Sequence, residues 1–198
     1  MWRPTVPARW PIWSTTPTRR VECPVGRPDQ DGKPAIIAPV TALFPADVDF
    51  VIALPDSILT PLIRRVIAHP RLQYIQVVHE AQAVGLAAGL SLAGRRPLVV
   101  MENSGLRSAA ESIGRLVVLH QIHLLFLVSG RGGFGDPNWW AQYHSRHAEE
   151  IARTFGLGYV EVKSAEEIGL CIHRGLSQVR TRNRSVVLSI DPAAMDGV

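Results

Sequence analysis

Short apolar runs alternate with longer mixed segments from residue 47 onward, and each kind of segment predicts one kind of element. Short, largely apolar runs predict buried strands, and they lie at 50–54, 74–78, 97–101, 123–129, 159–162 and 186–190. The segments between them predict helices, at 57–69, 80–93, from 105 to about 120, from after 136 to 155, and at 165–179. Strands buried on both faces and alternating with helices are typical of a parallel sheet covered on both sides. The sequence therefore predicts a doubly wound, mainly parallel α/β fold.

Turns that follow the first four strands are expected to meet at one edge of this sheet. Right-handed crossovers place every strand-to-helix turn at the carboxyl ends of the strands. Ligands of such sheets bind outside those ends. The sequence thus predicts a binding site built from residues 55–57, 79–80, 102–106 and 130–136.

The N-terminal part of the chain differs from the rest. Nine of the fifteen prolines lie within residues 1–45, and proline removes hydrogen bonds from helices and sheets alike. We expect residues 1–33 to form a poorly ordered tail, residues 34–46 to lead into the domain, and residues 47–198 to form it.

Composition excludes several classes of protein. Hydrophobic residues make up 46% and charged residues 19% of the chain, unlike a disordered or fibrous protein. The formal net charge of +4 comes from scattered arginines rather than one basic face. No apolar stretch approaches the roughly 20 residues of a membrane span. We therefore expect a cytoplasmic protein that binds neither nucleic acid nor a membrane.

Two short motifs suggest ligands but have simpler explanations. Residues 130–135 match GxGxxG, yet Asp136 and Pro137 follow at once and place a carboxylate where a pyrophosphate would sit. A glycine loop over the sheet edge explains them equally well. His144, His147 and Glu150 have a spacing that fits zinc on a helix, but solvated polar residues are the default interpretation. We expect no metal ligand on this chain.

Glu80 precedes an unusual helix. Residues 81–93 contain no charged residue, and only Gln82 and Ser91 are polar. A helix that is apolar all round is buried all round, and its alanines and glycines allow a second chain to approach closely. Favourable placement at a helix N-terminus explains the carboxylate of Glu80 but not its apolar surroundings. Those surroundings favour proton exchange with a ligand.

Three blocks of sequence carry a resemblance to a known family. They are His79–Gly89, Ala53–Leu59 and Met101–Leu106. In this order and spacing they resemble the pyrimidine-binding domain of thiamine-diphosphate enzymes, most of all phosphonopyruvate decarboxylase and the alpha subunit of sulfopyruvate decarboxylase. The resemblance extends over about 47–192. Three positions depart from the family, which usually has Gln where this chain has Glu102 and Gly-Asn where it has Arg107-Ser108.

The resemblance implies a fold, a cofactor and a set of site residues. It implies that Glu80 hydrogen-bonds the aminopyrimidine of thiamine diphosphate and is the catalytic residue. It places further cofactor contacts at Pro55, Asn103, Ser104 and Gly105. Candidates for proton handling and for the anionic end of the substrate are Asp56, Ser57, Arg131 and His144.

The resemblance also implies a partner. The family's diphosphate-binding domain holds Mg²⁺ through a Gly-Asp-Gly segment, and no such triplet occurs in these 198 residues. We expect a beta-type subunit to supply that domain and the Mg²⁺. The chain is then the alpha-type subunit of a 2-oxo acid decarboxylase, a carboxy-lyase active only with its partner. Two alternatives stay open: a carboligating, acetolactate-synthase-like subunit, and a non-catalytic regulatory partner of the same fold.

Overall fold

The computed structural model describes residues 44, 47–133, 136, 138–195 and 198. The tail expected at 1–33 lies outside the described residues. Of the expected lead-in segment, 34–46, only Phe44 is described, and its side chain is fully buried.

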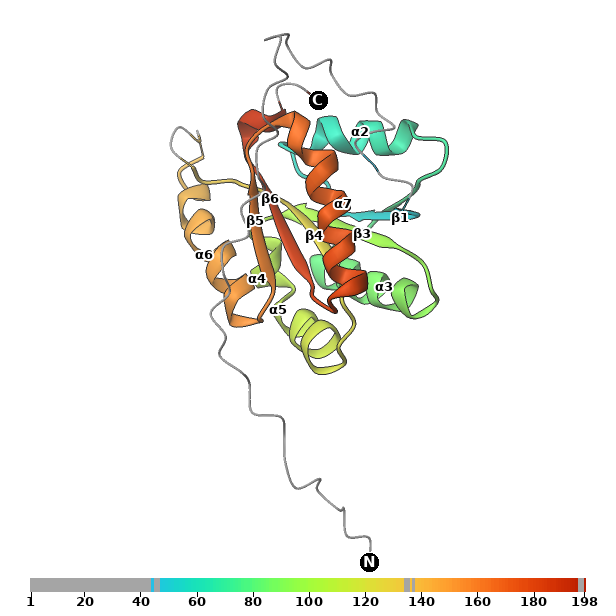
Figure 1. The fold of residues 1–198 in the computed structure, drawn as a ribbon. Coiled ribbons are helices and arrows are strands. Elements are labelled where there is room, and N and C mark those ends of the chain that lie inside the picture. Colours follow the sequence, from blue (N-terminus) through green and yellow to red (C-terminus); the bar gives the residue numbers. More distant parts are fainter. Residues whose placement is uncertain (1–43, 45–46, 134–135, 137, 196–197) are drawn as a thin grey trace, which may run out of the picture.

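Six parallel strands form one sheet (Figure 1). They are β1 (Phe50–Ala53), β2 (Gln73–Gln76), β3 (Pro97–Glu102), β4 (Leu125–Ser129), β5 (Gly158–Val162) and β6 (Val186–Ile190). Their order across the sheet is β2-β1-β3-β4-β6-β5, so β1, β3, β4 and β6 are central. The predicted parallel sheet is confirmed, and every strand begins or ends within a few residues of its predicted place.

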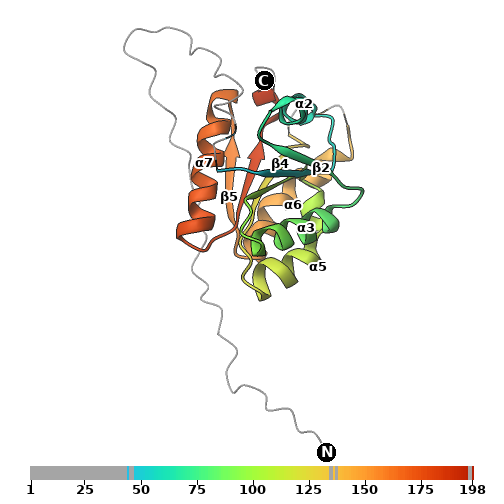
Figure 2. The ribbon, with the colours of Figure 1, turned by 90° about the vertical axis from the view of Figure 1, so that its right-hand side faces the viewer.

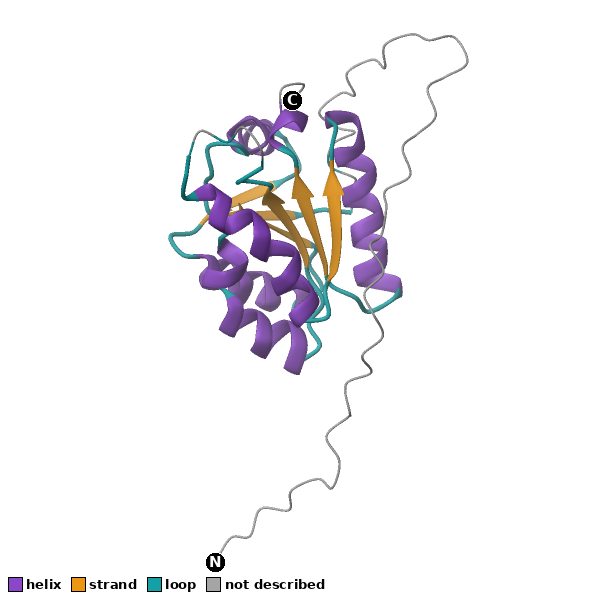
Figure 3. Cartoon of the chain, turned by 90° about the vertical axis from the view of Figure 1, so that its left-hand side faces the viewer, coloured by secondary structure: helices purple, strands orange, loops and turns teal. Residues whose placement is uncertain are grey.

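Helices cover both faces of the sheet (Figures 2 and 3). One face carries α2 (Thr60–Ala68) and α7 (Ala165–Thr181), whose apolar residues share a core with Phe44. The other face carries α3 (Glu80–Leu92), α4 (Gly105–Ser108), α5 (Ala110–Ser112), η1 (Ile113–Leu119) and α6 (Ala141–Thr154). A short 3₁₀ turn, η2 (Pro192–Met195), follows β6. Successive side chains of a strand point to opposite faces; accordingly, Val51 and Ala53 belong to one core and Ile52 to the other.

Two helices differ from their predicted form. The helix predicted from residue 57 begins at Thr60, because the carboxylate of Asp56 accepts hydrogen bonds from the backbone N–H groups of Ile58 and Leu59 and holds a turn first. The single helix predicted from 105 to about 120 is three pieces, α4, α5 and the π-helical η1. The break falls at Ala109, whose φ and ψ of −93° and 8° leave the helical region. Apolar periodicity does not distinguish these forms, since the same side chains face the core in each.

Helix α3 is only partly buried by this chain. Its apolar sequence predicts burial on every side with room for a second chain to approach, and the chain itself buries only Ala83, Val84, Ala87 and Ala88. Gly85, Leu86, Gly89 and Leu92 are exposed, and we call these four residues the α3 outer face. Gly94 ends the helix region with a φ of +73°, as its sequence position predicts. Among the described residues, no helix is long and apolar enough to cross a membrane.

Candidate functional site

Glu80 is the first residue of α3 and follows β2 at the carboxyl edge of the sheet. Its side chain is half-buried, and its Oε2 accepts a hydrogen bond of 2.8 Å from the hydroxyl of Ser108 on α4. The helix start is capped by the preceding residue, because the ring of His79 accepts from the N–H of Ala81. Since no described residue bonds to its Oε1, the carboxylate of Glu80 has one oxygen left for a ligand.

Gly105 lies directly against Glu80. A Cβ atom on Gly105 would come within 2.7 Å of the Cγ of Glu80 and within 2.7 Å of the Sδ of Met101. Those distances are shorter than van der Waals contact allows, so only glycine permits this approach. The loop after β3 therefore fixes the position of the Glu80 side chain.

Arg131 joins two other loops at the same edge. Its Nε lies 3.2 Å from Oδ2 of Asp56 and 3.3 Å from Oε2 of Glu102, and its Nη2 donates to the hydroxyl of Ser57. The side chain of Arg131 is 11% exposed and that of Asp56 only 3%. The guanidinium thus balances a buried carboxylate and links the loops after β1, β3 and β4.

Asn103 and Ser104 complete the loop after β3. Asn103 is buried and donates a hydrogen bond of 2.9 Å from its Nδ2 to the backbone carbonyl of Arg131, while the hydroxyl of Ser104 donates to Glu102. The Oδ1 of Asn103 is buried and has no partner in the described structure. A buried acceptor without a donor is costly, so this atom is available to a ligand that donates a hydrogen bond.

A cavity of about 220 Å³ opens beside this loop, at the carboxyl ends of β4, β5 and β6. It is lined by Asn103, Gly130, Arg131, Gly133, Tyr159, Glu161, Lys163, Ser189 and Asp191. Most of its lining residues are polar or charged, and it lies at the edge where α/β sheets bind their ligands.

The structure brings together most of the predicted site residues. Glu80 and Gly105 form one contact, and Asp56, Ser57 and Arg131 form another, with Asn103 and Ser104 on the loop between them. Pro55, on the loop after β1, is exposed. The side chain of His144 lies outside the described part of the structure.

The two alternative motifs gain no support from the described residues. The backbone N–H of Gly132 donates to Oδ2 of Asp136, and the backbone N–H of Asn138 donates to Oδ1. The carboxylate of Asp136 thus takes up the N–H of Gly132, a donor that a bound phosphate would need. These N–H groups, that of Asn138 foremost, hold the pKa of Asp136 below its usual value. His147 bonds to Glu150 at 3.0 Å. Among the described residues, no three His, Cys, Asp or Glu side chains are grouped as metal ligands.

Two residues of the site were not among the predicted site residues. Glu102 pairs with Arg131, and Ser108 donates to Glu80. Both residues could have been found from the sequence, because they lie at positions where the chain departs from the family that it resembles. Arg107, at the same departure, lies over the ring of Tyr143, 5.1 Å from its centroid.

Comparison with known proteins shows which proteins the chain is similar to. Residues 38–132 match the family described as thiamine pyrophosphate enzyme, N-terminal TPP binding domain. The sulfopyruvate decarboxylase subunit alpha of Methanococcus maripaludis is 33% identical over 126 residues, which are 64% of this chain and 75% of that protein. The phosphonopyruvate decarboxylase of Streptomyces viridochromogenes is 33% identical over 107 residues, or 54% of this chain but 26% of that protein.

A solved structure shares the fold. Benzoylformate decarboxylase from Polynucleobacter necessarius superimposes with a TM-score of 0.61 at 17% identity, over 76% of this chain and 28% of that chain. The six-stranded parallel sheet with helices on both faces is the fold of this class, the N-terminal domains of thiamine-diphosphate enzymes. Within that class, the chain belongs to the family of thiamine-diphosphate-dependent decarboxylases that includes the alpha subunits of sulfopyruvate decarboxylase. It spans about a quarter of the phosphonopyruvate and benzoylformate decarboxylases that it matches.

Proposed function

We propose that this chain binds the aminopyrimidine of thiamine diphosphate through Glu80, as the alpha-type subunit of a two-subunit 2-oxo acid decarboxylase. One observation carries the proposal: the carboxylate of Glu80 is held at the carboxyl edge by Ser108 and Gly105, with Oε1 left open. A carboxylate in that position can hold or accept a proton at a ring nitrogen.

The residues present suit this cofactor. An aminopyrimidine offers a ring nitrogen and an amino group, and the site offers a carboxylate oxygen on Glu80 and the orphaned Oδ1 of Asn103. Gly105 packs against the Cγ of Glu80 and leaves no room for a side chain at residue 105. No side chain from that residue therefore covers the carboxylate. Ser104, on the loop after β3, and Pro55, on the loop after β1, complete the proposed cofactor contacts.

Thiamine diphosphate, when bound, supplies the electron sink that allows a 2-oxo acid to lose carbon dioxide. Glu80 holds the proton at the pyrimidine nitrogen that tunes this chemistry. Arg131 faces the anionic end of the substrate, where a guanidinium suits a carboxylate, sulfonate or phosphonate. Its present partners are Asp56, Ser57 and Glu102, so an anionic substrate competes with Glu102, the more exposed of the two carboxylates at 29%. Asp56, Ser57 and His144 are proposed for proton handling.

The proposal includes a second chain. No Gly-Asp-Gly segment occurs in these 198 residues, so we assign the diphosphate and its Mg²⁺ to a beta-type subunit. Relatives named as alpha subunits of sulfopyruvate decarboxylase support a two-chain assembly. The α3 outer face, which starts one turn beyond Glu80, offers an apolar surface for that subunit to cover.

Co-expression with a thiamine-diphosphate domain that carries Gly-Asp-Gly tests the proposal. The purified pair is incubated with thiamine diphosphate, Mg²⁺ and a panel of 2-oxo acids that includes sulfopyruvate and phosphonopyruvate, and carbon dioxide release is measured. We expect stable co-purification and release from at least one acid. Condensation products without net release of the aldehyde would favour the carboligating alternative. A stable pair that binds the cofactor and converts no acid would favour the regulatory alternative.

A further inference from the structure

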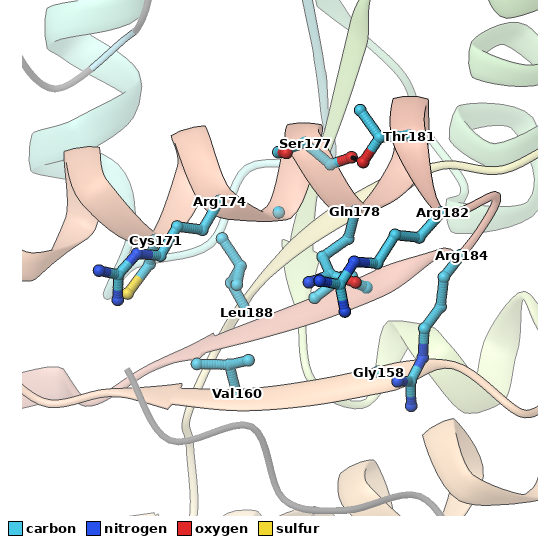
Figure 4. A pocket seen from close by; sticks show the side chains of 12 residues that line it. Gly158, Val160, Cys171, Arg174, Ser177, Gln178, Thr181, Arg182, Arg184 and Leu188 are labelled. Atoms are coloured by element: carbon cyan, nitrogen blue, oxygen red, sulfur yellow. Dashed lines mark hydrogen bonds between the residues drawn. The ribbon is translucent and has the colours of Figure 1, made fainter. Parts of the chain in front are cut away.

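A second cavity lies on the other face of the sheet, toward the amino ends of its strands. It occupies about 250 Å³ between α7 and strands β5 and β6 (Figure 4). We call it the arginine groove; it is lined by Gly158, Val160, Cys171, Arg174, Gly175, Ser177, Gln178, Thr181, Arg182, Arg184, Val186 and Leu188.

The charge of the arginine groove has one sign. Three of its lining residues are arginines, and none is acidic. Within the described structure, the guanidinium groups of Arg182 and Arg184 form no hydrogen bond or ion pair that would neutralise them. Arg180, just outside the groove, is instead paired with Asp47 at 3.2 Å. Uncompensated guanidinium groups beside a cavity attract anions.

A tight turn holds the two uncompensated arginines together. The backbone N–H groups of Arg182 and Arg184 both bond to the carbonyl of Gln178, and Asn183 between them has a φ of +48°. Arg182 extends into the space between α7 and the strands, and Arg184 reaches past Gly158 on β5 (Figure 4). The backbone that carries both arginines is therefore tied to the last turn of α7.

The floor of the arginine groove is apolar. Val160, Val186 and Leu188 are 6%, 4% and 1% exposed. Small-molecule sites are commonly apolar cavities with a few polar groups that fix orientation. At about 250 Å³ the groove lies just below the roughly 300–1,000 Å³ typical of drug-sized ligands, which indicates a small metabolite rather than a dinucleotide.

We propose that the arginine groove is a binding site for a small anion that carries a phosphate, sulfonate or carboxylate group on a short apolar body. The arginines bind the anionic group and the floor formed by β5 and β6 contacts the apolar body. The chain's own N-terminal segment does not suit the arginine groove, because residues 1–43 contain six basic and three acidic residues and therefore carry a net positive charge. Both strands continue to the polar cavity beside Asn103, so a ligand here contacts the same strands as the candidate site.

Titration of the full chain with defined anions tests the proposal. Phenyl phosphate carries both features, inorganic phosphate only the charge, and benzyl alcohol only the apolar body. Binding is followed by calorimetry at low ionic strength and by amide NMR shifts. We expect phenyl phosphate to bind with a Kd in the millimolar range or below, at least tenfold tighter than either other probe. The shifts should centre on Gly158, Gly175 and Asn183.

Matched variants distinguish this site from any other anion site. Arg182→Gln combined with Arg184→Gln should weaken phenyl phosphate binding at least tenfold. Arg64→Gln combined with Arg65→Gln removes the same charge from α2 and should leave the Kd unchanged. Arg182→Lys with Arg184→Lys, which keeps the charge, should restore part of the affinity and covers the case that the first variant folds poorly. Equal affinity in the Gln variant and the wild type, or shifts confined to Gly130 and Gly132 beside Arg131, would overturn the proposal.

Discussion

Arg131 is the residue on which the described site depends most for its stability. It is the cationic partner of Asp56, whose side chain is almost completely buried, and it also reaches Glu102 and Ser57. An ion pair of this kind contributes little net stability while intact, but the loss of one member leaves a buried charge without compensation.

We expect Arg131→Met to reduce the free energy of unfolding by about 3–5 kcal/mol, because it leaves the buried carboxylate of Asp56 without a cationic partner. Arg153→Met removes an exposed pair with Glu149 and should cost at most about 1 kcal/mol. Urea unfolding measures both. Addition of Asp56→Asn to the first variant should recover part of the loss. A loss for Arg131→Met no larger than that of the control would contradict the role assigned to the pair.

Gly105 is the second critical residue. We expect Gly105→Ala to weaken thiamine diphosphate binding in the assembled enzyme at least tenfold, because its Cβ would displace Glu80 or Met101. Overpacking of this kind costs about 1–3 kcal/mol of stability. Gly114→Ala on η1 is the control, since a Cβ there would meet only the Cε1 of Phe155 at 3.5 Å, an ordinary contact. Equal cofactor affinity in both variants would show that Glu80 is not positioned by residue 105.

Helices and strands were predictable where the hydrophobic pattern alone decided the type of element. The strands follow from short apolar runs, because only a doubly covered parallel sheet buries such runs on both faces. The ends of the helices were less predictable. Asp56 delays the start of α2 through hydrogen bonds to its own loop, and the break at Ala109 depends on φ and ψ angles that composition does not encode.

The amino ends of two central strands are joined by charges. Arg96, just before β3, donates to Asp49, just before β1, at 2.6 Å, and Arg95 lies 3.7 Å from the same carboxylate. The hydrogen bond from Arg96 is the main reason that the pKa of Asp49 lies below its usual value, and burial opposes it.

This pair predicts a pH dependence of stability. Because the pKa of Asp49 is lowered on folding, its contribution is present above the usual value of 3.8 and is lost as the pH falls through the lowered value. Asp49→Asn should therefore lower the Tm at pH 6 by on the order of 2 °C, and the difference from wild type should shrink toward pH 3. Glu111→Gln, in an exposed pair with Arg115, is the control. A difference that stays constant from pH 6 to pH 3 would contradict this assignment.

The apolar pattern of helix α3 is not explained by the packing of this chain alone. Its sequence is apolar on every side, and the chain alone buries only four of its thirteen residues. A Cβ added at either glycine of the α3 outer face would meet nothing within 4 Å. A backbone so exposed allows close approach of a partner helix or loop.

We expect Leu86→Gln combined with Leu92→Gln to leave the stability of the isolated chain within about 0.5 kcal/mol, since both side chains are exposed, at 39% and 75%. The same variant should weaken association with the beta-type subunit at least tenfold. Ile67→Gln, on α2 and 60% exposed, serves as the control. Sedimentation or light scattering of mixed subunits measures the association. Unchanged association would show that the partner binds another face.

At the scale of the whole molecule, the site is an edge where loops from four strands converge. The position of that edge was predictable, because right-handed crossovers place those loops together. The position of Glu80 at the start of an apolar helix also marked it in the sequence. The link between Arg131 and Asp56 was not predictable, because it joins side chains 75 residues apart whose approach depends on the packed sheet. The arginine groove was not predicted either, since its members are spread over β5, α7 and β6.

The central claim is that Glu80 serves the cofactor rather than the fold. Glu80→Gln keeps the size of the side chain and an oxygen that can accept from Ser108, but it removes the exchangeable proton. A carboxylate that only favours a helix start contributes at most about 1 kcal/mol, so the Tm should change little. Loss of acid–base assistance should slow turnover by about 10²–10⁴-fold.

The direct measurement is carbon dioxide release by the assembled enzyme with saturating thiamine diphosphate, alongside the Tm of the same samples. Glu150→Gln, on the exposed side of α6, is the matched control and should behave like the wild type in both. Turnover of Glu80→Gln reduced at least a hundredfold, with an unchanged Tm, is the result that we expect. Near-normal turnover of the Glu80→Gln enzyme would contradict the account.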